Sequence, residues 1–554
     1  MAASTQIEIE RKYDADQDVV VPDFAGVSGI SRAEAQGTVT LEAVYYDTEA
    51  GDLAANRITL RRRTGGKDAG WHAKLPGDAG RTEVHAPLGR ASSTSDPRVP
   101  RALLDHVRVH VRDRPLVPVA RISTTRTIIH LLDEDDRAIA ELADDVVSAT
   151  EVRDGTVRQW REWEAELLDV GSAVSAADGA RILDAIEERL LEAGARPSAS
   201  RSKLAHALGR DDLSAPTTGA GLDAVPARFD AEHLAAPVAV AALRALLRAL
   251  KHADPAVRRR DSESVHDMRT GVRRLRSALA AFGGVFDREV SDDLRDRLRR
   301  LGSVLGTARD LEVRAARAEA ALDAVPGGLV PGTSGENDAH SRLVEETQAD
   351  YRRAVTTALR FLSSAPYYRL LDDLDAFVDA PPLGPRADRP AEKEFSRIIA
   401  GEVKRTRKRI RAVRRAVAVD DGSVAVEQEH LLHDARKAAR RLRYTIEAMS
   451  VDAPGGAGAG TGNGQGSGPL GSGAKGLAKA AKRVQGALGD HRDGMLFAEH
   501  LMSESKRAHT EGESTFILGV LHERSRREAA DALAGADAAF RALRKRATRW
   551  RKRR

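Results

Sequence analysis

The chain has 554 residues, is 42% hydrophobic but only 4% aromatic, and contains no cysteine. Its length predicts two or three globular domains with cores built mainly from Ala, Leu and Val, and the lack of cysteine excludes disulfides, thiolate zinc sites and cysteine nucleophiles. No apolar run approaches the ~18 residues of a membrane span, and the polar start shows no signal peptide; we therefore expect a cytoplasmic protein with no membrane partner.

The net charge of +5 conceals opposite balances in two parts of the chain. Residues 1–210 carry a net charge of −7, whereas residues 211–554 carry +12. This asymmetry predicts a local site of mixed charge in the first part and a broad positive surface, suited to an anionic ligand, in the second.

The first strand-like stretch alternates charged and apolar side chains. Because successive side chains of a strand point to opposite faces, Glu8, Glu10 and Lys12 share one face, opposite Ile7 and Ile9. Carboxylates suit Mg²⁺ or Mn²⁺, and an ammonium group suits phosphate. The charged face therefore predicts a cavity that holds a metal ion and an anion together.

Similar alternation recurs in short segments separated by Gly, Asp and Pro. These segments cover residues 44–47, 57–63, 71–75, 121–131, 138–147 and 160–168. A solvated face is the simpler interpretation of any single strand. Together, however, the signs segregate: acidic side chains occupy the first and last strands, and basic ones the strands between. We therefore expect an antiparallel barrel with a charged bore and an apolar outside covered by helices or loops.

The part beyond residue 228 is helical in its periodicity and rich in Ala, Leu and Arg, as is the earlier segment 173–193. We expect a linker at 211–226 between a domain at 1–210 and a helical domain at 227–550. The glycine-rich stretch 454–473 predicts a flexible insertion. The basic end, residues 549–554, is expected to fray rather than fold.

Two motifs occur twice in the helical part. The pattern apolar-His-Asp-x-Arg-x-x-x-Arg-Arg-Leu-Arg begins at Val265 and Leu432, and Leu-Gly-x-x-Arg-Asp begins at Leu305 and Leu488. The offsets, 167 and 183 residues, differ by 16, which is close to the length that the glycine-rich insertion adds. Two tandem copies, at about 227–380 and 390–550, are the simplest explanation.

Each copy places a histidine and several arginines on one helix face. Their spacings of three and four residues align His266, Arg269, Arg273 and Arg276 in the first copy and His433, Arg436, Arg440 and Arg443 in the second. A solvated face is the alternative for either row alone. Like charges at these spacings destabilise a helix by a few tenths of a kcal/mol per pair, so their repetition predicts an anion that neutralises both rows. No second histidine or carboxylate stands at zinc-ligand spacing.

The ordered motifs of residues 1–210 resemble the CYTH superfamily, the triphosphate tunnel metalloenzymes. They are Glu8-x-Glu10-x-Lys12, Leu60-Arg61-x-Arg63, Lys74, Arg126, Glu162-x-Glu164-x-Glu166 and Ser202-Lys203-Leu204. The resemblance implies an eight-stranded antiparallel β-barrel tunnel with flanking helices, and hydrolysis of inorganic triphosphate or short polyphosphate with Mg²⁺ or Mn²⁺. The residues implied in catalysis are Glu8, Glu10, Lys12 and Glu164.

The same resemblance implies two sets of ligands. The phosphate ligands are Lys12, Arg61, Arg63, Lys74, Arg126 and Lys203. The metal or water ligands are Glu8, Glu10, Asp145, Glu162, Glu164 and Glu166. Two choices stay open, because a slip of one residue would turn Asp144 inward instead of Asp145, and the functional pair among the three glutamates depends on the same register.

The helical part resembles the CHAD domain, over about residues 227–550. The resemblance implies an all-α helical bundle of two repeats around a basic groove, associated with inorganic polyphosphate. The matching residues are His266, Arg269, Arg273, Arg276, Arg309, His433, Arg436, Arg440, Arg443 and Arg492.

An α+β protein of two domains is therefore expected, in which the tunnel hydrolyses triphosphate and the helical domain binds polyphosphate. One alternative is a non-catalytic protein that binds polyphosphate and is targeted to polyphosphate granules. Another is a tunnel that acts on a nucleoside or thiamine triphosphate, with cyclase-type chemistry included. Nucleic acid is the least favoured partner, because few aromatic residues intersperse the basic rows. No protein partner is indicated.

Overall fold

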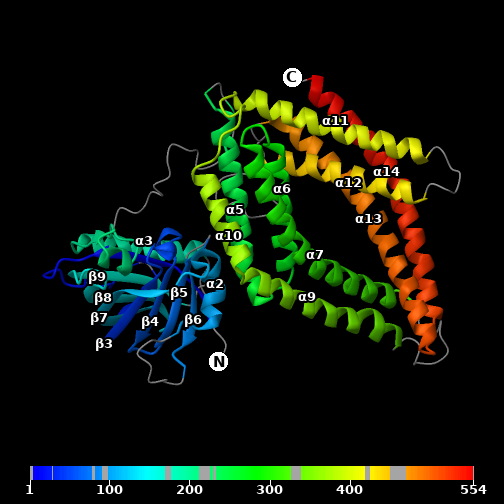
Figure 1. Ribbon diagram of the computed structural model, residues 1–554. Helices are drawn as coiled ribbons and strands as arrows, with labels where there is room; N and C mark the ends of the chain where they lie inside the picture. Colours follow the sequence, from blue (N-terminus) through cyan, green and yellow to red (C-terminus); the bar gives the residue numbers. More distant parts are fainter. Residues whose placement is uncertain are drawn as a thin grey trace. The chain divides into compact units, whose positions relative to one another are not determined.

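The computed structural model divides the chain into two compact units, Met1–Thr218 and Gly219–Arg554 (Figure 1). It describes residues 4–27, 29–77, 81–89, 98–168, 176–210, 225–226, 229, 232–325, 338–417, 425–449 and 470–552. Most of the predicted linker, 211–224, and of the predicted glycine-rich insertion, 454–469, lies outside these residues. No helix within the described ranges is both long and apolar enough to span a bilayer.

The described part of the first unit is an antiparallel sheet of ten strands with short and medium helices. The strands are β1 (Ser4–Glu8), β2 (Glu10–Asp14), β3 (Arg32–Asp47), β4 (Thr59–Thr64), β5 (Gly70–Pro76), β6 (Arg81–Pro87), β7 (Val117–Leu132), β8 (Ala138–Glu151), β9 (Val157–Leu167) and β10 (Arg196–Pro197). The helices are α1 (Asp52–Ala55), α2 (Arg101–Val111), α3 (Ala176–Glu192) and α4 (Lys203–Ala207).

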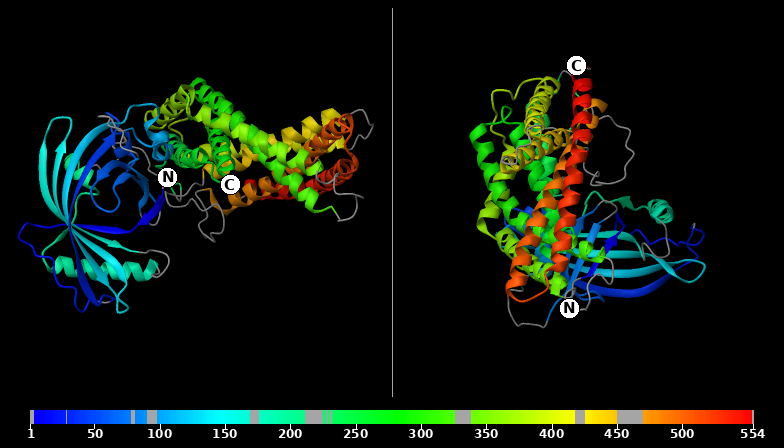
Figure 2. Two further views of the ribbon diagram at one scale, coloured as in Figure 1. Left: turned by 90° about the horizontal axis from the view of Figure 1, so that it is seen from below. Right: turned by 90° about the vertical axis from the view of Figure 1, so that its right-hand side faces the viewer.

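The sheet is open, with the strand order β1-β6-β5-β4-β3-β7-β8-β9-β2-β10. The predicted eight-stranded barrel is therefore not confirmed. The first strand is interrupted at Ile9, so that β1 pairs with β6 and β2 pairs with β9, and the short β10 pairs with β2. Strands β1 and β2 thus lie near opposite ends of the sheet, although only Ile9 separates them in the chain. The long strands curve strongly (Figure 2).

The outer face of the sheet is apolar and is covered by helices. Leu183 and Ile186 of α3 pack in one core with Trp163, and Leu103 of α2 packs in another with Trp71. Burying each large apolar side chain contributes about 1.5–3 kcal/mol. Because the apolar residues of the alternating strands are used outside, their charged neighbours are left on the inside.

The described part of the second unit is helical, apart from isolated β-bridges. Its elements are α5 (Ala235–Arg259), α6 (Ser264–Ala281), α7 (Arg288–Asp323), the π-helix η1 (Ser341–Glu345), α9 (Glu346–Leu362), α10 (Ala365–Asp379), α11 (Ala391–Val417), α12 (Ala425–Ala448), α13 (Gly471–Thr510) and α14 (Phe516–Lys552). Helix α14 continues to Lys552, so the expected fraying of the basic end is wrong for residues 549–552.

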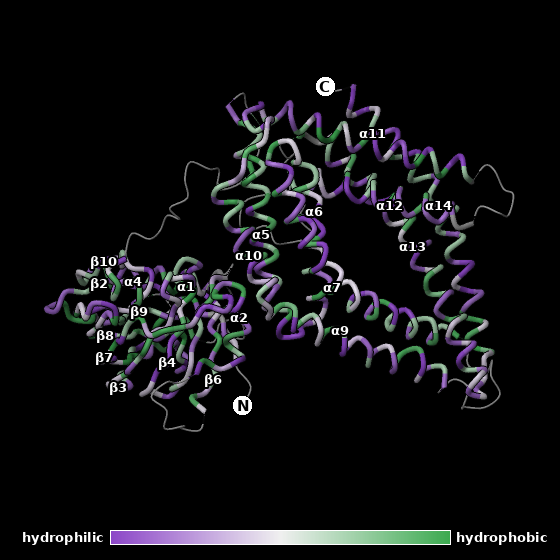
Figure 3. The backbone as a smooth tube through the Cα atoms, in the orientation of Figure 1, coloured by the Kyte–Doolittle hydropathy of each residue, from purple (hydrophilic) through white to green (hydrophobic). Residues whose placement is uncertain are grey.

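The helices of this unit are amphipathic, as the mixed colours along them show (Figure 3). In α6, Val265, Met268 and Val272 are buried in the core, whereas Arg269 and Arg273 are half-buried beside them. Helix α6 contacts α12, which carries the second row of arginines. The division of this unit into two repeats stays a prediction.

Candidate active site

The charged face of the first strand lines a cavity of about 450 Å³ in the first unit, where Glu8, Glu10 and Lys12 all reach it. The opposite face points outward. There Arg11 forms ion pairs with Asp184 (2.5 Å) and Glu187 (2.9 Å) of α3. The interruption at Ile9 therefore leaves the alternation of inward and outward side chains intact.

Basic side chains from several elements reach the same cavity. All six predicted phosphate ligands line it, namely Lys12, Arg61, Arg63, Lys74, Arg126 and Lys203. Arg61 and Arg63 come from β4, Lys74 from β5 and Arg126 from β7. The Nζ atom of Lys74 lies 2.6 Å from Oε2 of Glu8, so acidic and basic groups meet directly across the cavity.

The register of the sheet sets the acidic residues in rows. Glu166 of β9 lies opposite both Glu10 of β2 and Glu141 of β8. Four residues earlier on β9, Glu162 lies opposite Asp145. Glu8, Glu10, Glu164 and Glu166 line the cavity directly, whereas Asp145 and Glu162 are buried behind it.

The two adjacent aspartates of β8 point to opposite faces. Arg126 donates hydrogen bonds from Nε and Nη2 to the two carboxylate oxygens of Asp145, at 2.8 and 2.6 Å. Asp144 instead accepts hydrogen bonds from Arg161 and from the indole nitrogen of Trp163. The structure thus places Asp145, and not Asp144, on the inner side.

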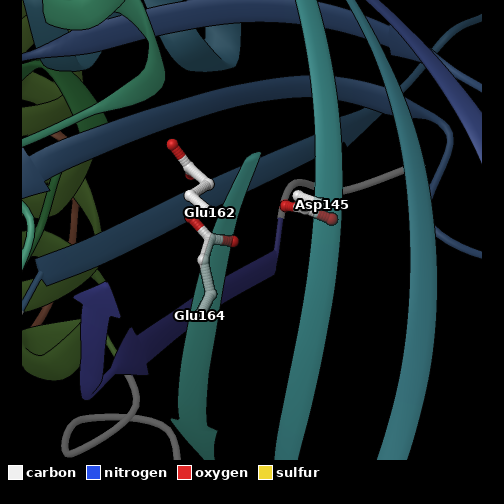
Figure 4. A group of neighbouring side chains, drawn as sticks. All are labelled: Asp145, Glu162 and Glu164. Carbon is white, nitrogen blue, oxygen red and sulfur yellow. The ribbon is translucent and has the colours of Figure 1, made fainter. Parts of the chain in front are cut away.

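Asp145, Glu162 and Glu164 form a buried carboxylate triad, in which one oxygen from each residue lies within 4.8 Å of the others. Figure 4 shows Asp145 on β8 beside Glu162 and Glu164 on β9. The Nζ atom of Lys203 lies 2.5 Å from Glu162 and 2.8 Å from both Asp145 and Glu164. The triad therefore surrounds a cationic group of the chain itself.

Helix α4 brings Lys203 to this position, and three contacts hold the helix. The hydroxyl of Ser202 caps its N-terminus by accepting a hydrogen bond from the backbone nitrogen of Ala205. The ring of His206 stacks on Trp160 of β9 at 4.2 Å, and Arg158 donates a hydrogen bond to the carbonyl oxygen of Ala207. The contacts of Trp160 and Arg158 tie α4 to the strand that carries two members of the triad.

The carboxyl groups of the cavity differ in their pKa values. Burial raises the pKa of Glu8 to about 8, against the opposing effect of Lys74. Burial also raises the pKa of Glu166 to about 7, and the nearby Glu10 adds to this rise. For Glu164, by contrast, the attraction of Lys12, Lys203 and Arg126 outweighs burial and holds the pKa well below its usual value. The basic neighbours thus favour the charged form of Glu164, whereas burial favours the protonated forms of Glu8 and Glu166.

Sequence reasoning missed several residues that line the cavity, among them Tyr45, Glu83, His130 and Glu141. Nη1 of Arg61 donates a hydrogen bond to the hydroxyl of Tyr45 at 3.3 Å, and its Nη2 lies 3.6 Å from Glu83. The alternation of Arg81, Glu83 and His85 along β6 was the signal in the sequence that could have revealed this strand. In the sheet, Glu83 pairs in register with Lys74.

In the second unit, arginines of α6 and α12 crowd one another. Burial and the neighbouring Arg269 and Arg440 lower the pKa of Arg273 to about 10. Burial and Arg436, in turn, lower the pKa of Arg440. Arginines normally stay charged far above neutral pH, so these shifts show that burial and the neighbouring positive charges both disfavour the charged guanidinium groups.

The Leu-Gly-x-x-Arg-Asp motifs have a packing role. A Cβ atom on Gly306 of α7 would lie 3.4 Å from Nη2 of Arg269, and one on Gly489 of α13 would lie 3.3 Å from Nη2 of Arg436. Each glycine thus leaves room for an arginine guanidinium against the helix. The aspartate of each motif forms an ion pair with the same arginine: Asp310 lies 2.9 Å from Arg269, and Asp493 lies 3.9 Å from Arg436.

Other predicted members of the basic surface are placed differently. Arg309 forms ion pairs with Glu263 and Glu312, and Arg443 pairs with Glu447 at 2.6 Å. His266 is exposed on α6. Burial, Lys437 and Arg492 lower the pKa of His433 to about 4, so this histidine is neutral at pH 7 and does not add to the positive charge.

The first unit is an antiparallel sheet around a mixed-charge cavity, and the second is helical with facing rows of arginine. Together they define a CYTH domain joined to a CHAD domain. A CYTH domain model matches residues 6–187 and a CHAD domain model matches residues 241–461. The chain belongs to the proteins that carry a CYTH domain followed by a CHAD domain.

The chain is similar over almost its whole length to uncharacterized proteins from two strains of Mycobacterium tuberculosis. Each is 36% identical over 529 residues, which cover 93% of this chain and 92% of the relative. Among solved structures, PptA from Streptomyces chartreusis is 21% identical, covers 56% of this chain and 100% of its own, and has a TM-score of 0.43. HpAC1 from Hippeastrum, a candidate adenylyl cyclase described with a dominant triphosphatase activity, is 19% identical, covers 37% and 96%, and has a TM-score of 0.23.

CYTH domains act on triphosphates and depend on a divalent metal ion. The membership and the buried triad of Asp145, Glu162 and Glu164 therefore indicate a triphosphate-related function and a site that could bind a divalent ion.

Proposed function

We propose that the first unit hydrolyses inorganic triphosphate, or the end of a short polyphosphate chain, with a bound Mg²⁺ or Mn²⁺. The observation that supports this most strongly is the convergence of eight lysine and arginine side chains and six glutamates on a single cavity of about 450 Å³. A linear triphosphate offers several charged oxygens along its length, so it can engage arginines and lysines from several strands at once.

The carboxylate triad fits the proposed metal. Mg²⁺ and Mn²⁺ prefer oxygen ligands, and the ammonium of Lys203 already lies among the oxygens of Asp145, Glu162 and Glu164. A divalent ion held by these residues would supply positive charge to stabilise the phosphate and would lower the pKa of a bound water molecule. Glu8, Glu10 and Glu166 are the further proposed ligands of the metal or of the attacking water.

The basic residues bind and orient the phosphate chain in this proposal. Arg61, Arg63 and Arg126 offer guanidinium groups that can hold phosphate oxygens in a bidentate manner and stabilise the charge spread over the transferred phosphoryl group. Lys12 and Lys74 add point charges beside Glu10 and Glu8. No covalent nucleophile is required, because positioning and charge stabilisation account for most of the catalysis of phosphoryl transfer.

A nucleotide is the less favoured substrate. The described residues that line the cavity include no Trp or Phe, and its aromatic side chains are Tyr45 and His130. Tyr45 is almost fully buried and contacts Arg61, so it offers little surface on which a base could stack.

The reaction is tested by measuring phosphate release from tripolyphosphate with Mg²⁺ or Mn²⁺. We expect Glu10→Ala to abolish release and Arg61→Gln to reduce it strongly. Arg62→Gln is the matched control, because Arg62 lies on the same strand but is not part of the cavity lining. Equal release by the wild type and by Glu10→Ala would reject the proposal, as would equal losses for the Arg61 and Arg62 variants.

The second unit is proposed to bind polyphosphate through the facing arginines of α6 and α12, and this would also localise the protein to polyphosphate granules. The full chain carrying Glu10→Ala is suited to the test, because it should bind polyphosphate without consuming it. Adding Arg273→Gln should weaken binding. Adding Arg288→Gln should not, because the side chain of Arg288 is 86% exposed and pairs locally with Asp292. A DNA duplex of matched charge at the same ionic strength should bind more weakly; equal binding would favour nucleic acid.

A further inference from the structure

The side chain of Lys203 pairs with buried carboxylates and also lines the cavity. Its ammonium is within 2.8 Å of all three carboxylates of the triad, yet the residue also lines the cavity that the proposed phosphate chain would enter. The backbone of Lys203 is held at the first turn of α4 by the Ser202 cap. Only the flexible four-carbon side chain is therefore free to change position.

The ammonium and a divalent ion cannot use the triad simultaneously. Mg²⁺ binds carboxylate oxygens at about 2.0–2.1 Å, inside the space between Glu162 and Asp145 where Nζ of Lys203 now lies. Two cations within a few ångströms of each other, away from bulk water, repel strongly. Lys203 must leave the triad when a metal enters, and the nearby Glu8 and Glu10 already pair with Lys74 and Lys12.

We infer that Lys203 is an exchangeable counter-ion that occupies the carboxylate triad until a divalent ion and a phosphate-like anion bind together. The inference rests on the proposed function, because it takes the triad of Asp145, Glu162 and Glu164 as the metal site. Without an anion, metal binding must displace Lys203 into a cavity where Glu8 and Glu10 already have basic partners. With an anion, the ammonium gains a partner there. Lys203 thereby couples the two binding events, and by linkage the coupling acts equally in both directions.

The full-length, metal-free protein is titrated with Mn²⁺ alone, and free Mn²⁺ is measured by electron paramagnetic resonance. We expect Lys203→Gln to bind Mn²⁺ at least tenfold more tightly than the wild type. Lys203→Arg, which keeps the charge, should stay close to the wild type. Arg62→Gln, which removes a charge outside the cavity lining, should change the affinity less than twofold.

The second arm repeats the titrations with sulfate as a probe for the phosphate-like anion, at an ionic strength matched with chloride. Sulfate should tighten Mn²⁺ binding to the wild type severalfold, and this effect should be lost in Lys203→Gln. The inference is overturned if Lys203→Gln binds Mn²⁺ no more tightly than the wild type, or if sulfate has equal effects on both.

Folding of the variant is followed by circular dichroism with and without Mn²⁺. If Lys203→Gln folds only when Mn²⁺ is present, the metal has replaced the missing ammonium, as expected. If it folds in neither condition, Lys203 is a structural cross-link and the inference is wrong. A wild type that shows this Mn²⁺ and sulfate behaviour but releases no phosphate from tripolyphosphate would reject the proposed reaction and leave the exchange intact.

Discussion

Gly489→Ala is expected to stabilise the helical unit and yet weaken its anion binding. Gly489 lies inside α13, where alanine is favoured over glycine by about 0.8–1 kcal/mol, equivalent to a rise in Tm of about 2 °C for a unit of this size. The new Cβ atom, however, would lie 3.3 Å from Nη2 and 3.4 Å from Nε of Arg436. The guanidinium must therefore move by a few tenths of an ångström from its present position.

The loss of affinity can be bounded. Deleting a charged hydrogen bond costs about 1.5–3 kcal/mol, and displacing the guanidinium of Arg436 should cost a fraction of that, about 0.7–1.4 kcal/mol. Affinity for a short polyphosphate should fall about three- to tenfold. Isothermal titration calorimetry on the full chain in the Glu10→Ala background measures the affinity, and differential scanning calorimetry measures the Tm.

Gly486→Ala is the matched control. Gly486 lies one turn earlier on the same helix, and a Cβ atom there would meet no heavy atom within 4 Å. This variant should gain the same helix stability and keep the wild-type affinity. The reasoning is refuted if the two alanine variants bind polyphosphate equally well, because Arg436 would then not depend on the space that Gly489 leaves.

Three further results are expected for the first unit. Asp145→Asn should abolish metal-dependent phosphate release. Asp144→Asn, on the outer face, should keep this activity but lower the free energy of unfolding in denaturant by about 1–3 kcal/mol. The opposite pattern would mean that the register is wrong. In the metal-free protein, Glu166 should add a negative slope to the dependence of stability on pH between about 5 and 7, because burial raises the pKa of Glu166 to about 7 and the native state keeps a proton that the unfolded chain releases. Glu166→Gln should flatten this slope in Tm measured against pH, and an unchanged slope would contradict the assignment. Trp160→Leu should lose the stack on His206, loosen α4 and raise the rate of hydrogen exchange in this helix. An unchanged exchange rate would mean that the stack does not hold α4.

Local periodicity was enough to find most of the proposed site. A strand turns alternate side chains to alternate faces whatever its partners are, so the inward positions of Glu8, Glu10 and Lys12 on the first strand could be read from the sequence. The pair Arg61 and Arg63 followed in the same way. The helical second unit was equally predictable, because its apolar residues recur at helical spacing over long stretches.

Pairing between strands decided what periodicity left open. Asp144 and Asp145 are neighbours, and only the alignment of β8 with β7 and β9 shows which of them faces Arg126. The same long-range pairing divides the first strand at Ile9 between opposite ends of an open sheet, whereas the family resemblance had implied a barrel of eight strands. Alternation within a single strand carries no information about its neighbours.

The sequence by itself determined the composition of the two units, the inward and outward faces of their strands, and the rows of arginine on their helices, because these follow from the few residues on either side of each position. Only the tertiary structure decided which charges meet. It set Lys203, from a short helix 39 residues beyond Glu164, among the triad, and it neutralised Arg309 with Glu263 and Glu312 while leaving Arg273 crowded by other arginines. Electrostatic energy depends on distances in space, and these arise only when segments that are remote in the chain pack together.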